Sequence, residues 1–251
     1  MTTNVFDRLQ LLATSDSRWS YKINEREILY VDNTEFDKIT VRNEFCMVFA
    51  GNSLLIQDWK AWLHQPREKL SLFNRPPYHI YIDGTDVVVS LCMIHVPTGN
   101  IWEDSDLGAL RVSDEARFSG TGAEPAKTCW TTNKCARTAV KSAVTVDHYS
   151  GGQIQYVDLR TQDHNLNVVT PRTLLASSID EAVKERGYHM DIETKISTPI
   201  ADHPAAPELL QRIGGGQLYA SAPVGLGVRW TPELEKKFDA ALQKAIEEGR
   251  L

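Results

Sequence analysis

The chain has 251 residues, enough for one large domain, or one and a half, with a sizeable core. Its formal net charge is −6 and it contains no long basic stretch, which argues against nucleic acid or an anionic membrane as a partner. No apolar run is long enough to span a bilayer and no basic-then-apolar leader precedes Val5, so we expect a cytoplasmic protein.

Metal and cofactor chemistry is not indicated. The cysteines show no C-x-x-C spacing; they are Cys46, Cys92, Cys129 and Cys135. We expect free thiols in a reducing compartment. The histidines are scattered, without an H-E-x-x-H pattern, so the sequence predicts no metal site and no cofactor.

The amino terminus predicts a β-hairpin. Two apolar runs, residues 5–9 and 11–13, flank Gln10, although neither Gly nor Pro marks the turn. Antiparallel pairing would bring Asp16 and Arg18, at the far end of the second strand, back to the start of the chain. We therefore expect a carboxylate and a guanidinium next to Thr2.

This placement suggests an amino-terminal threonine nucleophile. A threonine hydroxyl is a weak nucleophile until a base takes its proton, and the α-amine of the same residue has a pKa near neutrality. Met1 precedes a small residue, so its removal would expose Thr2. The alternative is that Met-Thr-Thr is an ordinary start without chemistry.

The next segments contain two further candidates. We expect a loop over residues 19–27, a strand over 28–31, and a strand beginning at 36–39, in which Lys38 is either an exposed lysine or a buried one that acts on a neighbouring hydroxyl. The apolar run 45–50 predicts a strand buried on both faces.

A helix over residues 53–65 follows this run, capped by Asn52 or Ser53. The N–H groups at this junction, including that of Gly51, either stabilise an oxyanion or belong to a routine strand–helix connection.

The middle of the chain predicts antiparallel sheet and helices. Strands are expected at 78–83, 86–96 and 100–103, with turns at Asp83-Gly84 and 97–99. Gly120 and Gly122 allow close backbone approach beside Thr121. Further elements are a helix in one or two pieces over 123–146, a strand over 153–159 that pairs with 167–169, and a helix over 179–186.

The last sixty residues differ in character. Residues 200–207 are rich in Pro and Ala, and 214–216 and 220–227 are loop-like. A helix is expected from Thr231 to about Glu248, because Pro232 and acidic residues lie in its first turn. Its single apolar face must dock on the main body or on another subunit.

Taken in order, these motifs resemble a proteasome β-type subunit of the amino-terminal-nucleophile (Ntn) hydrolases, a superfamily that includes bacterial proteasome-like peptidases. The resemblance covers about residues 2–190 and is carried by Thr2-Thr3, Asp16-Ser17-Arg18, Lys38-Ile39, Phe49-Ala50-Gly51, Gly120-Thr121-Gly122 and Asp147-His148-Tyr149-Ser150-Gly151-Gly152. The last motif is the most telling.

The resemblance implies an α+β fold, a four-layer αββα sandwich of two antiparallel sheets. Its domain would span residues 1–190, and 191–251 would be a carboxyl-terminal extension ending in an amphipathic helix. The implied catalytic residues are Thr2 as nucleophile, Asp16 and Lys38 to position and polarise it, the N–H of Gly51 as oxyanion donor, and Asp147 and Ser150 to orient the amine, with Thr121 where the family usually has Ser. Ser20 and Phe49 would line the substrate cleft.

The first hairpin is one or two residues shorter than the family norm, so Thr2, Thr3 or Met1 could occupy the nucleophile position. We favour Thr2, because removal of Met1 exposes it and a two-residue deletion preserves the alternation of the strand.

The functional hypothesis is a threonine-type endopeptidase that hydrolyses polypeptides and assembles into a homo-oligomeric ring or related particle. An ATP-dependent unfoldase is the further partner that this hypothesis suggests. One alternative is a non-catalytic structural or interaction subunit that retains Met1. Another is an Ntn amidase that acts on small amides.

Overall fold

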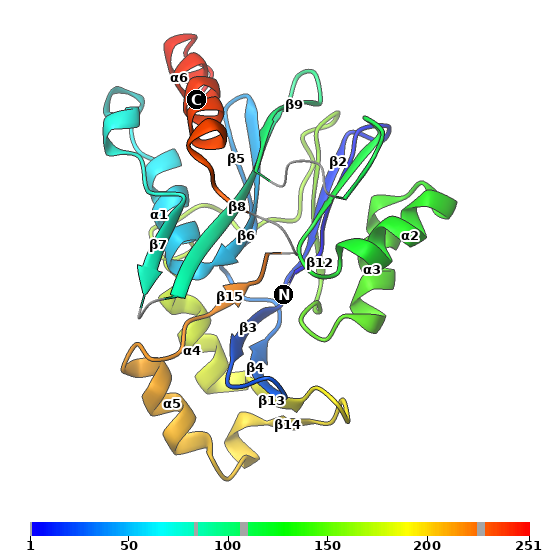
Figure 1. Cartoon of the computed structure of the whole chain (residues 1–251), viewed down its shortest axis with the longest axis vertical. Helices are drawn as coiled ribbons and strands as arrows, with labels where there is room; N and C mark the ends of the chain where they lie inside the picture. The colour runs from blue at the N-terminus through cyan, green and yellow to red at the C-terminus, as the bar shows by residue number, and fades with distance from the viewer. Residues whose placement is uncertain (1, 83–84, 106–109, 225–228) are drawn as a thin grey trace.

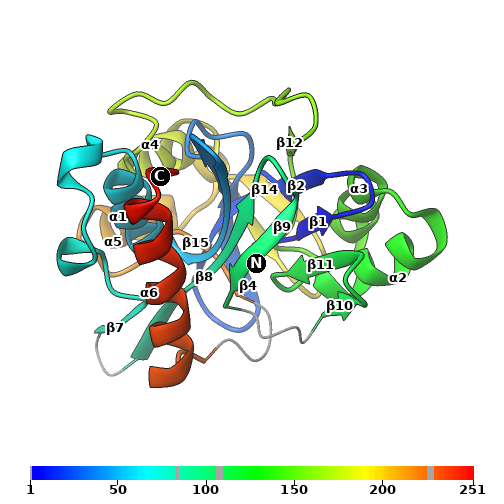
Figure 2. The same ribbon diagram turned by 90° about the horizontal axis from the view of Figure 1, so that it is seen from above.

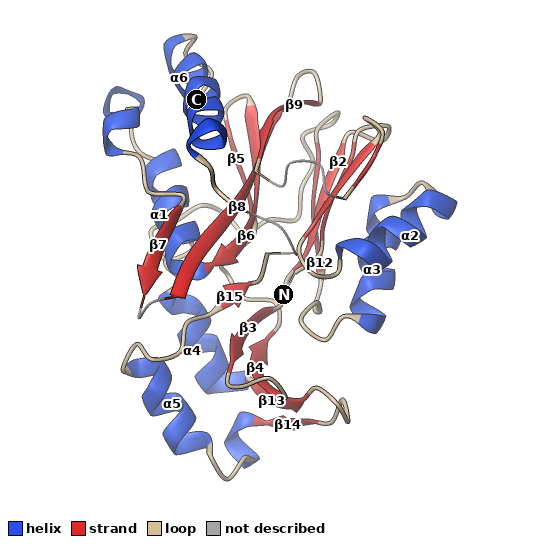
Figure 3. Cartoon of the chain, viewed as in Figure 1, coloured by secondary structure: helices blue, strands red, loops and turns tan. Residues whose placement is uncertain are grey.

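The computed structural model describes residues 2–82, 85–105, 110–224 and 229–251. Within them the chain is a mixed α/β protein with two antiparallel sheets and six α-helices (Figure 1, Figure 3). The turn expected at Asp83-Gly84 lies outside the described residues.

The predicted amino-terminal hairpin is confirmed. Strand β1 (Asn4–Asp7) pairs with β2 (Leu12–Asp16), and Leu11 adopts a left-handed conformation at the reversal, with φ 53°. The hairpin forms the middle of a five-stranded sheet of order β10-β11-β1-β2-β12. The remaining strands are β10 (Arg111–Val112), β11 (Ala116–Ser119) and β12 (Ile154–Asp158).

The second sheet is larger, with the order β14-β13-β4-β3-β15-β6-β8-β7 and with β5 and β9 added against β6 and β8. Its strands in chain order are β3 (Trp19–Lys22), β4 (Glu27–Val31), β5 (Ile39–Arg42), β6 (Phe45–Asn52), β7 (His79–Ile82), β8 (Thr85–His95), β9 (Asn100–Asp104), β13 (Tyr188–Asp191), β14 (Ser197–Pro199) and β15 (Ser221–Ala222). The run expected to be buried on both faces, now β6, is buried throughout.

Two expectations about strands were wrong. Residues 19–22 are not a loop but strand β3, on which Trp19 and Tyr21 are fully buried; only residues 23–26 are irregular, and Glu27 begins β4. Residues 167–169 form no strand with β12, since Asn167 instead donates from its side chain to the Asp37 carboxylate, at 2.8 Å.

Helices flank the pair of sheets (Figure 2). On the five-stranded sheet lie α2 (Ala123–Asn133) and α3 (Ala136–Val146), two pieces separated at Lys134, which has φ 48°. The largest core joins the outer face of the second sheet to α1 (Ser53–Leu63), α4 (Ser177–Arg186), α5 (Ala206–Gly214) and α6 (Pro232–Glu247). A third cluster fills the space between the sheets, with Phe6 and Val157 from one and Val48 and Ile94 from the other.

The carboxyl-terminal segment belongs to this same packing. Helix α5 was not predicted; it lies between the Pro- and Ala-rich residues and the loop-like residues 214–216. Helix α6 begins after Thr231, whose hydroxyl accepts from the Leu234 N–H at 3.2 Å. The apolar face of α6 docks on the main body, because Phe238 and Leu242 are fully buried in the largest core.

Candidate functional site

The junction between β6 and α1 has a conformation that requires glycine. Gly51 has φ 122°, and a Cβ at this position would overlap the carbonyl of Val88. Asn52 then caps α1, with its Oδ1 accepting from the N–H of Leu54 at 2.9 Å. The sharp turn of the chain places the end of β6 beside the start of the helix.

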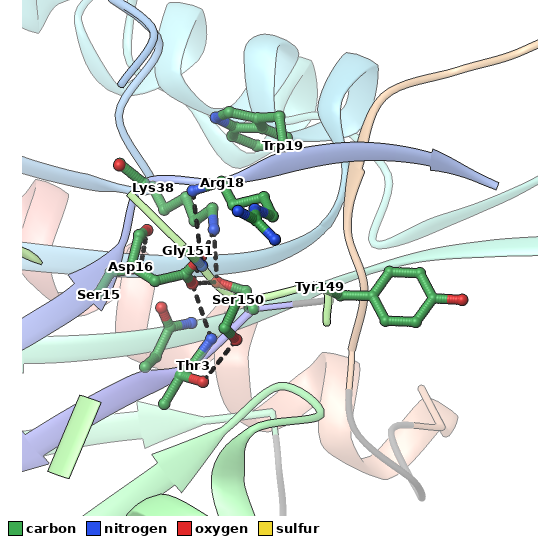
Figure 4. A network of polar contacts seen from close by, with 12 residues as sticks. Thr3, Ser15, Asp16, Arg18, Trp19, Lys38, Tyr149, Ser150 and Gly151 are labelled. Atoms are coloured by element: carbon green, nitrogen blue, oxygen red, sulfur yellow. Dashed lines mark hydrogen bonds and ion pairs between the residues drawn. The ribbon is translucent and has the colours of Figure 1, made fainter. Parts of the chain in front are cut away.

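A buried ionic cluster lies at the start of the chain (Figure 4). Lys38 Nζ donates to Thr2 Oγ1 at 2.7 Å and lies 2.9 Å from Asp16 Oδ1. The Thr2 hydroxyl itself donates to Asp16 Oδ1 at 2.5 Å. All three side chains are fully buried, so a lysine, a carboxylate and a hydroxyl interact without competition from solvent.

Backbone donors hold the Asp16 carboxylate in place. Its Oδ1 also accepts from Thr3 N at 2.8 Å, and its Oδ2 accepts from Gly151 N at 3.0 Å and Arg18 N at 3.1 Å. Burial lowers the pKa of the Lys38 amine, and the charge and hydrogen bond of Asp16 act against that effect. The carboxylate therefore supports a positive charge on the amine that faces the Thr2 hydroxyl.

A second chain of hydroxyl groups runs beside the first. Thr3 Oγ1 lies 2.7 Å from Ser150 Oγ, which donates to Asp147 Oδ2 at 2.6 Å. Thr121 Oγ1 donates to the same carboxylate oxygen at 3.1 Å. Ser150 was expected to orient the amine of Thr2, and its hydroxyl contacts the hydroxyl of the next residue, Thr3.

Gly120 and Gly122, on either side of Thr121, allow the backbone to approach Thr2 and Thr3 closely. Gly122 N donates to Thr2 O at 3.2 Å, and a Cβ on Gly120 would overlap that carbonyl. A Cβ on Gly122 would overlap Thr3 Oγ1. The close approach that the sequence predicted for this motif is therefore made to the backbone and side chains of the amino-terminal threonines.

The guanidinium expected next to Thr2 is elsewhere, which corrects that prediction. Arg18 forms two hydrogen bonds to the Asp32 carboxylate, at 2.8 and 2.9 Å, and a third to His148 O at 2.8 Å. Its guanidinium also lies 3.8 Å from the centre of the Tyr30 ring. Arg18 thus joins β4 to the turn that carries Ser150, and only its backbone N–H reaches Asp16.

Ser20 and Phe49, expected to line a substrate cleft, and Gly51, expected to donate to an oxyanion, differ from one another in their surroundings. Ser20 and Gly51 face the short strand β15, in the pairs Ser20↔Ser221 and Gly51↔Ala222. The Phe49 side chain is fully buried in the largest core. Its carbonyl oxygen, in contrast, accepts from Asn4 Nδ2 at 3.0 Å and so connects β6 to the hairpin.

Reasoning from the sequence missed three contributors. Thr3 was weighed only as a rival nucleophile, although both its N–H and its hydroxyl belong to the network. Asp32 was not singled out, because its pairing with Arg18 follows no local pattern. Strand β15 is too short to show an alternation of its own.

Among the described residues, no group of three or more His, Cys, Asp and Glu side chains could hold a metal ion. The helices in that part of the chain are also too short or too polar to cross a membrane.

No family model matches the chain, and no curated protein matches it. Among solved structures it is similar to a Gly-1 mutant of Anbu from Hyphomicrobium sp. strain MC1, with 13% identity and a TM-score of 0.38. That similarity covers 86% of this chain and 95% of the other.

Proposed function

We propose that the protein is a threonine-type peptidase of the proteasome-like Ntn hydrolases, in which Thr2 is the nucleophile after Met1 has been removed. One observation carries the proposal: the Lys38 amine donates to Thr2 Oγ1 at 2.7 Å while paired with Asp16 in a fully buried site. A buried lysine directed at the Thr2 hydroxyl matches the needs of a threonine nucleophile.

The reaction follows from these groups. The Thr2 oxygen attacks the carbonyl carbon of a peptide bond, and its proton passes to the free α-amine of the same residue. The C–N bond then breaks, the departing amine takes that proton, and an ester remains on Thr2. Water hydrolyses the ester, which releases the acid and restores the hydroxyl.

The other predicted site residues have supporting positions. Lys38 polarises the Thr2 oxygen, and Asp16 holds the lysine charge beside it. Asp147, Ser150 and Thr121 form a hydrogen-bonded chain that orients the amino-terminal segment through Thr3. The N–H of Gly51 would stabilise the oxyanion when the substrate is bound.

The same proposal extends to fold and assembly. The two sheets between helix layers are taken as an αββα sandwich, with residues 1–190 as the Ntn domain and 191–251 as an extension that completes its core. We propose a cytoplasmic homo-oligomer, a ring or related particle, that receives unfolded polypeptides, with an ATP-dependent unfoldase as a further partner. Large apolar side chains exposed on the monomer, such as Phe73 and Tyr81, are candidates for subunit contacts.

The test begins with the intact mass of the purified protein. A mass that lacks one methionine is expected, because the mechanism needs the free amine of Thr2. Thr2→Ala should then abolish hydrolysis of an unfolded polypeptide and leave the native mass of the assembly unchanged.

The matched control is Thr131→Ala. Thr131 is an exposed threonine of α2 whose hydroxyl donates to Lys127 O of its own helix, so this variant should keep full activity. Retention of Met1, or a fully active Thr2→Ala variant, would overturn the proposal and favour a non-catalytic subunit. Hydrolysis of small amides but not of peptides would favour an amidase.

A further inference from the structure

Strand β15 occupies an unusual place in the second sheet. It lies between β3 and β6, so that β4 and β3 on one side and β6 and β8 on the other are joined through it (Figure 1). All other strands of this sheet path come from the first 200 residues, whereas β15 comes from the carboxyl-terminal segment. A segment of the tail therefore fills a slot between two strands of the main body.

The residues that border this slot are those assigned to substrate and oxyanion. Ser20 pairs with Ser221 on one side, and Gly51 pairs with Ala222 on the other. Ser53 N donates to Ala220 O at 3.0 Å. Because hydrogen-bonded and non-hydrogen-bonded pairs alternate in an antiparallel ladder, Gly51 and Ala222 form the next hydrogen-bonded pair, and the Gly51 N–H faces the tail.

The tail has the form of a bound peptide that is held weakly. Ala220 and Ala222 are buried but contribute only methyl side chains, and the hydroxyls of Ser20 and Ser221 reach the opposite backbone carbonyls at 3.4 Å. Pro223 follows directly and has no N–H to continue the ladder. Within residues 220–222, the attachment consists of backbone pairing and small side chains.

We propose that residues 220–222 are an internal plug, which occupies the slot where an extended polypeptide substrate pairs with β3 and β6. This inference rests on the proposed function. While the plug is in place, the Gly51 N–H is directed at Ala222 and a substrate has no free strand edge to pair with. Substrate entry then requires the tail strand to leave.

The first experiment opens the slot. Ala222→Pro removes the N–H that pairs with Gly51, and hydrogen exchange of the amides of residues 219–222 and 51–53 shows whether the strand has been released. Two electrophiles then report on Thr2: a small β-lactone, which needs no strand pairing, and a tripeptide epoxyketone, which does. Modification is read as the added mass on the amino-terminal peptide.

The plug predicts a difference between these two probes. In Ala222→Pro the epoxyketone should react at least tenfold faster than in the wild type, while the β-lactone, which gains the released Gly51 N–H but needs no strand pairing, should gain less. Tyr219→Pro serves as the control, because Tyr219 lies in the same segment but forms none of the pairs of β15. It should change neither rate.

The second experiment closes the slot. The variant Ser20→Cys with Ser221→Cys joins two residues that face each other across β3 and β15, and mass spectrometry after alkylation verifies that these two thiols alone have paired. Compared with the reduced form of the same variant, the oxidised form should lose the epoxyketone reaction and keep the same β-lactone rate, and renewed reduction should restore the epoxyketone reaction.

If Ala222→Pro does not fold, Ala222→Gly should raise the epoxyketone rate in the same direction but less.

The failures are distinguishable. If hydrogen exchange shows that the strand is released but the epoxyketone rate does not rise, the plug is wrong, while β-lactone labelling of Thr2 leaves the proposed function standing. An oxidised lock that leaves the epoxyketone rate unchanged also overturns the plug. If neither probe modifies Thr2 in protein that lacks Met1, the proposed function fails and the plug fails with it.

Discussion

Two buried lysines, Lys38 and Lys60, differ in what their amines contact. Lys38 Nζ contacts Thr2 Oγ1 and Asp16 Oδ1. Lys60 Nζ donates to the backbone carbonyls of Asp37, at 3.0 Å, and Thr173, at 3.5 Å, and lies 4.2 Å from the centre of the Phe36 ring. Burial lowers the pKa of both amines.

The carboxylates near the two lysines, Asp16 and Asp37, also differ in their contacts. Asp16 pairs directly with Lys38, whereas the Asp37 carboxylate is occupied by the side chains of Gln155, at 2.5 Å, and Asn167, at 2.8 Å. Burial and a lowered pKa are therefore common to both lysines, and only the hydroxyl in contact with Lys38 marks a candidate reaction centre. A perturbed pKa points to function only when the group has something to act on.

The comparison is tested most severely by replacing each lysine with methionine. Lys38→Met should reduce peptide hydrolysis by about 10³-fold, within the range for loss of a group that assists proton transfer. It should also lower the free energy of unfolding by about 3 kcal/mol, because Asp16 is left buried without its cation. Steady-state hydrolysis and urea denaturation measure the two effects.

Lys60→Met is the matched control. Its amine contacts only carbonyl oxygens and an aromatic ring, so hydrolysis should stay within twofold of the wild type. Equal losses of activity in the two variants would contradict the distinction between the two lysines.

The second prediction concerns alkaline pH. Burial lowers the pKa of Lys60 from 10.5 to about 8, so between these values the unfolded chain holds more protons than the folded one, and stability from this group rises with pH. From pH 8 to 9.5 the difference in unfolding free energy between wild type and Lys60→Met should shift by about 2 kcal/mol in favour of the wild type. Urea midpoints of both proteins across this range provide the measurement, and parallel curves would show that Lys60 does not titrate there.

The third prediction concerns Gln155, whose side chain contacts both the Lys38 backbone and the Asp37 carboxylate. Gln155 accepts from Lys38 N at 3.3 Å and donates to Asp37 Oδ1. Gln155→Ala should lower the free energy of unfolding by about 1 kcal/mol, since it leaves a buried carboxylate oxygen with one donor fewer. Gln153→Ala, at an exposed position just before the same strand, should have no effect in thermal or urea unfolding.

The smallest effect is expected at Thr121. Thr121→Ser keeps the hydroxyl that donates to Asp147, so hydrolysis should stay within about twofold of the wild type. Thr121→Val removes the donor at nearly constant volume and should be slower than Thr121→Ser when kcat and KM are compared. Indistinguishable rates for the two variants would exclude a part for this hydroxyl in orienting Asp147.

Local patterns sufficed for much of the fold. The hairpin, α1 with its Asn52 cap and the body of α4 follow from periodicity and capping. The roles of Asp16 and Lys38 beside Thr2 came instead from the resemblance to a family, and the structure brings the three side chains into contact.

What could not be predicted depends on distant partners. Trp19 and Tyr21 are buried because they belong to the largest core, where the Tyr21 hydroxyl donates to Asp180 of α4. The Arg18 side chain finds Asp32 across a strand pair, a contact that no spacing in the sequence encodes. Strand β15 has only two residues, so its position is set entirely by the edges that it joins.

The position of β15 also has a consequence for how the molecule folds. Ser20 and Ser221 are 201 positions apart, so this sheet contains pairings of very high contact order. Closing so long a loop is slow, and it cannot begin until residues 221 and 222 have left the ribosome. Until then β3 and β6 have unpaired edges that other nascent chains could join, so we expect refolding yields to fall steeply with protein concentration.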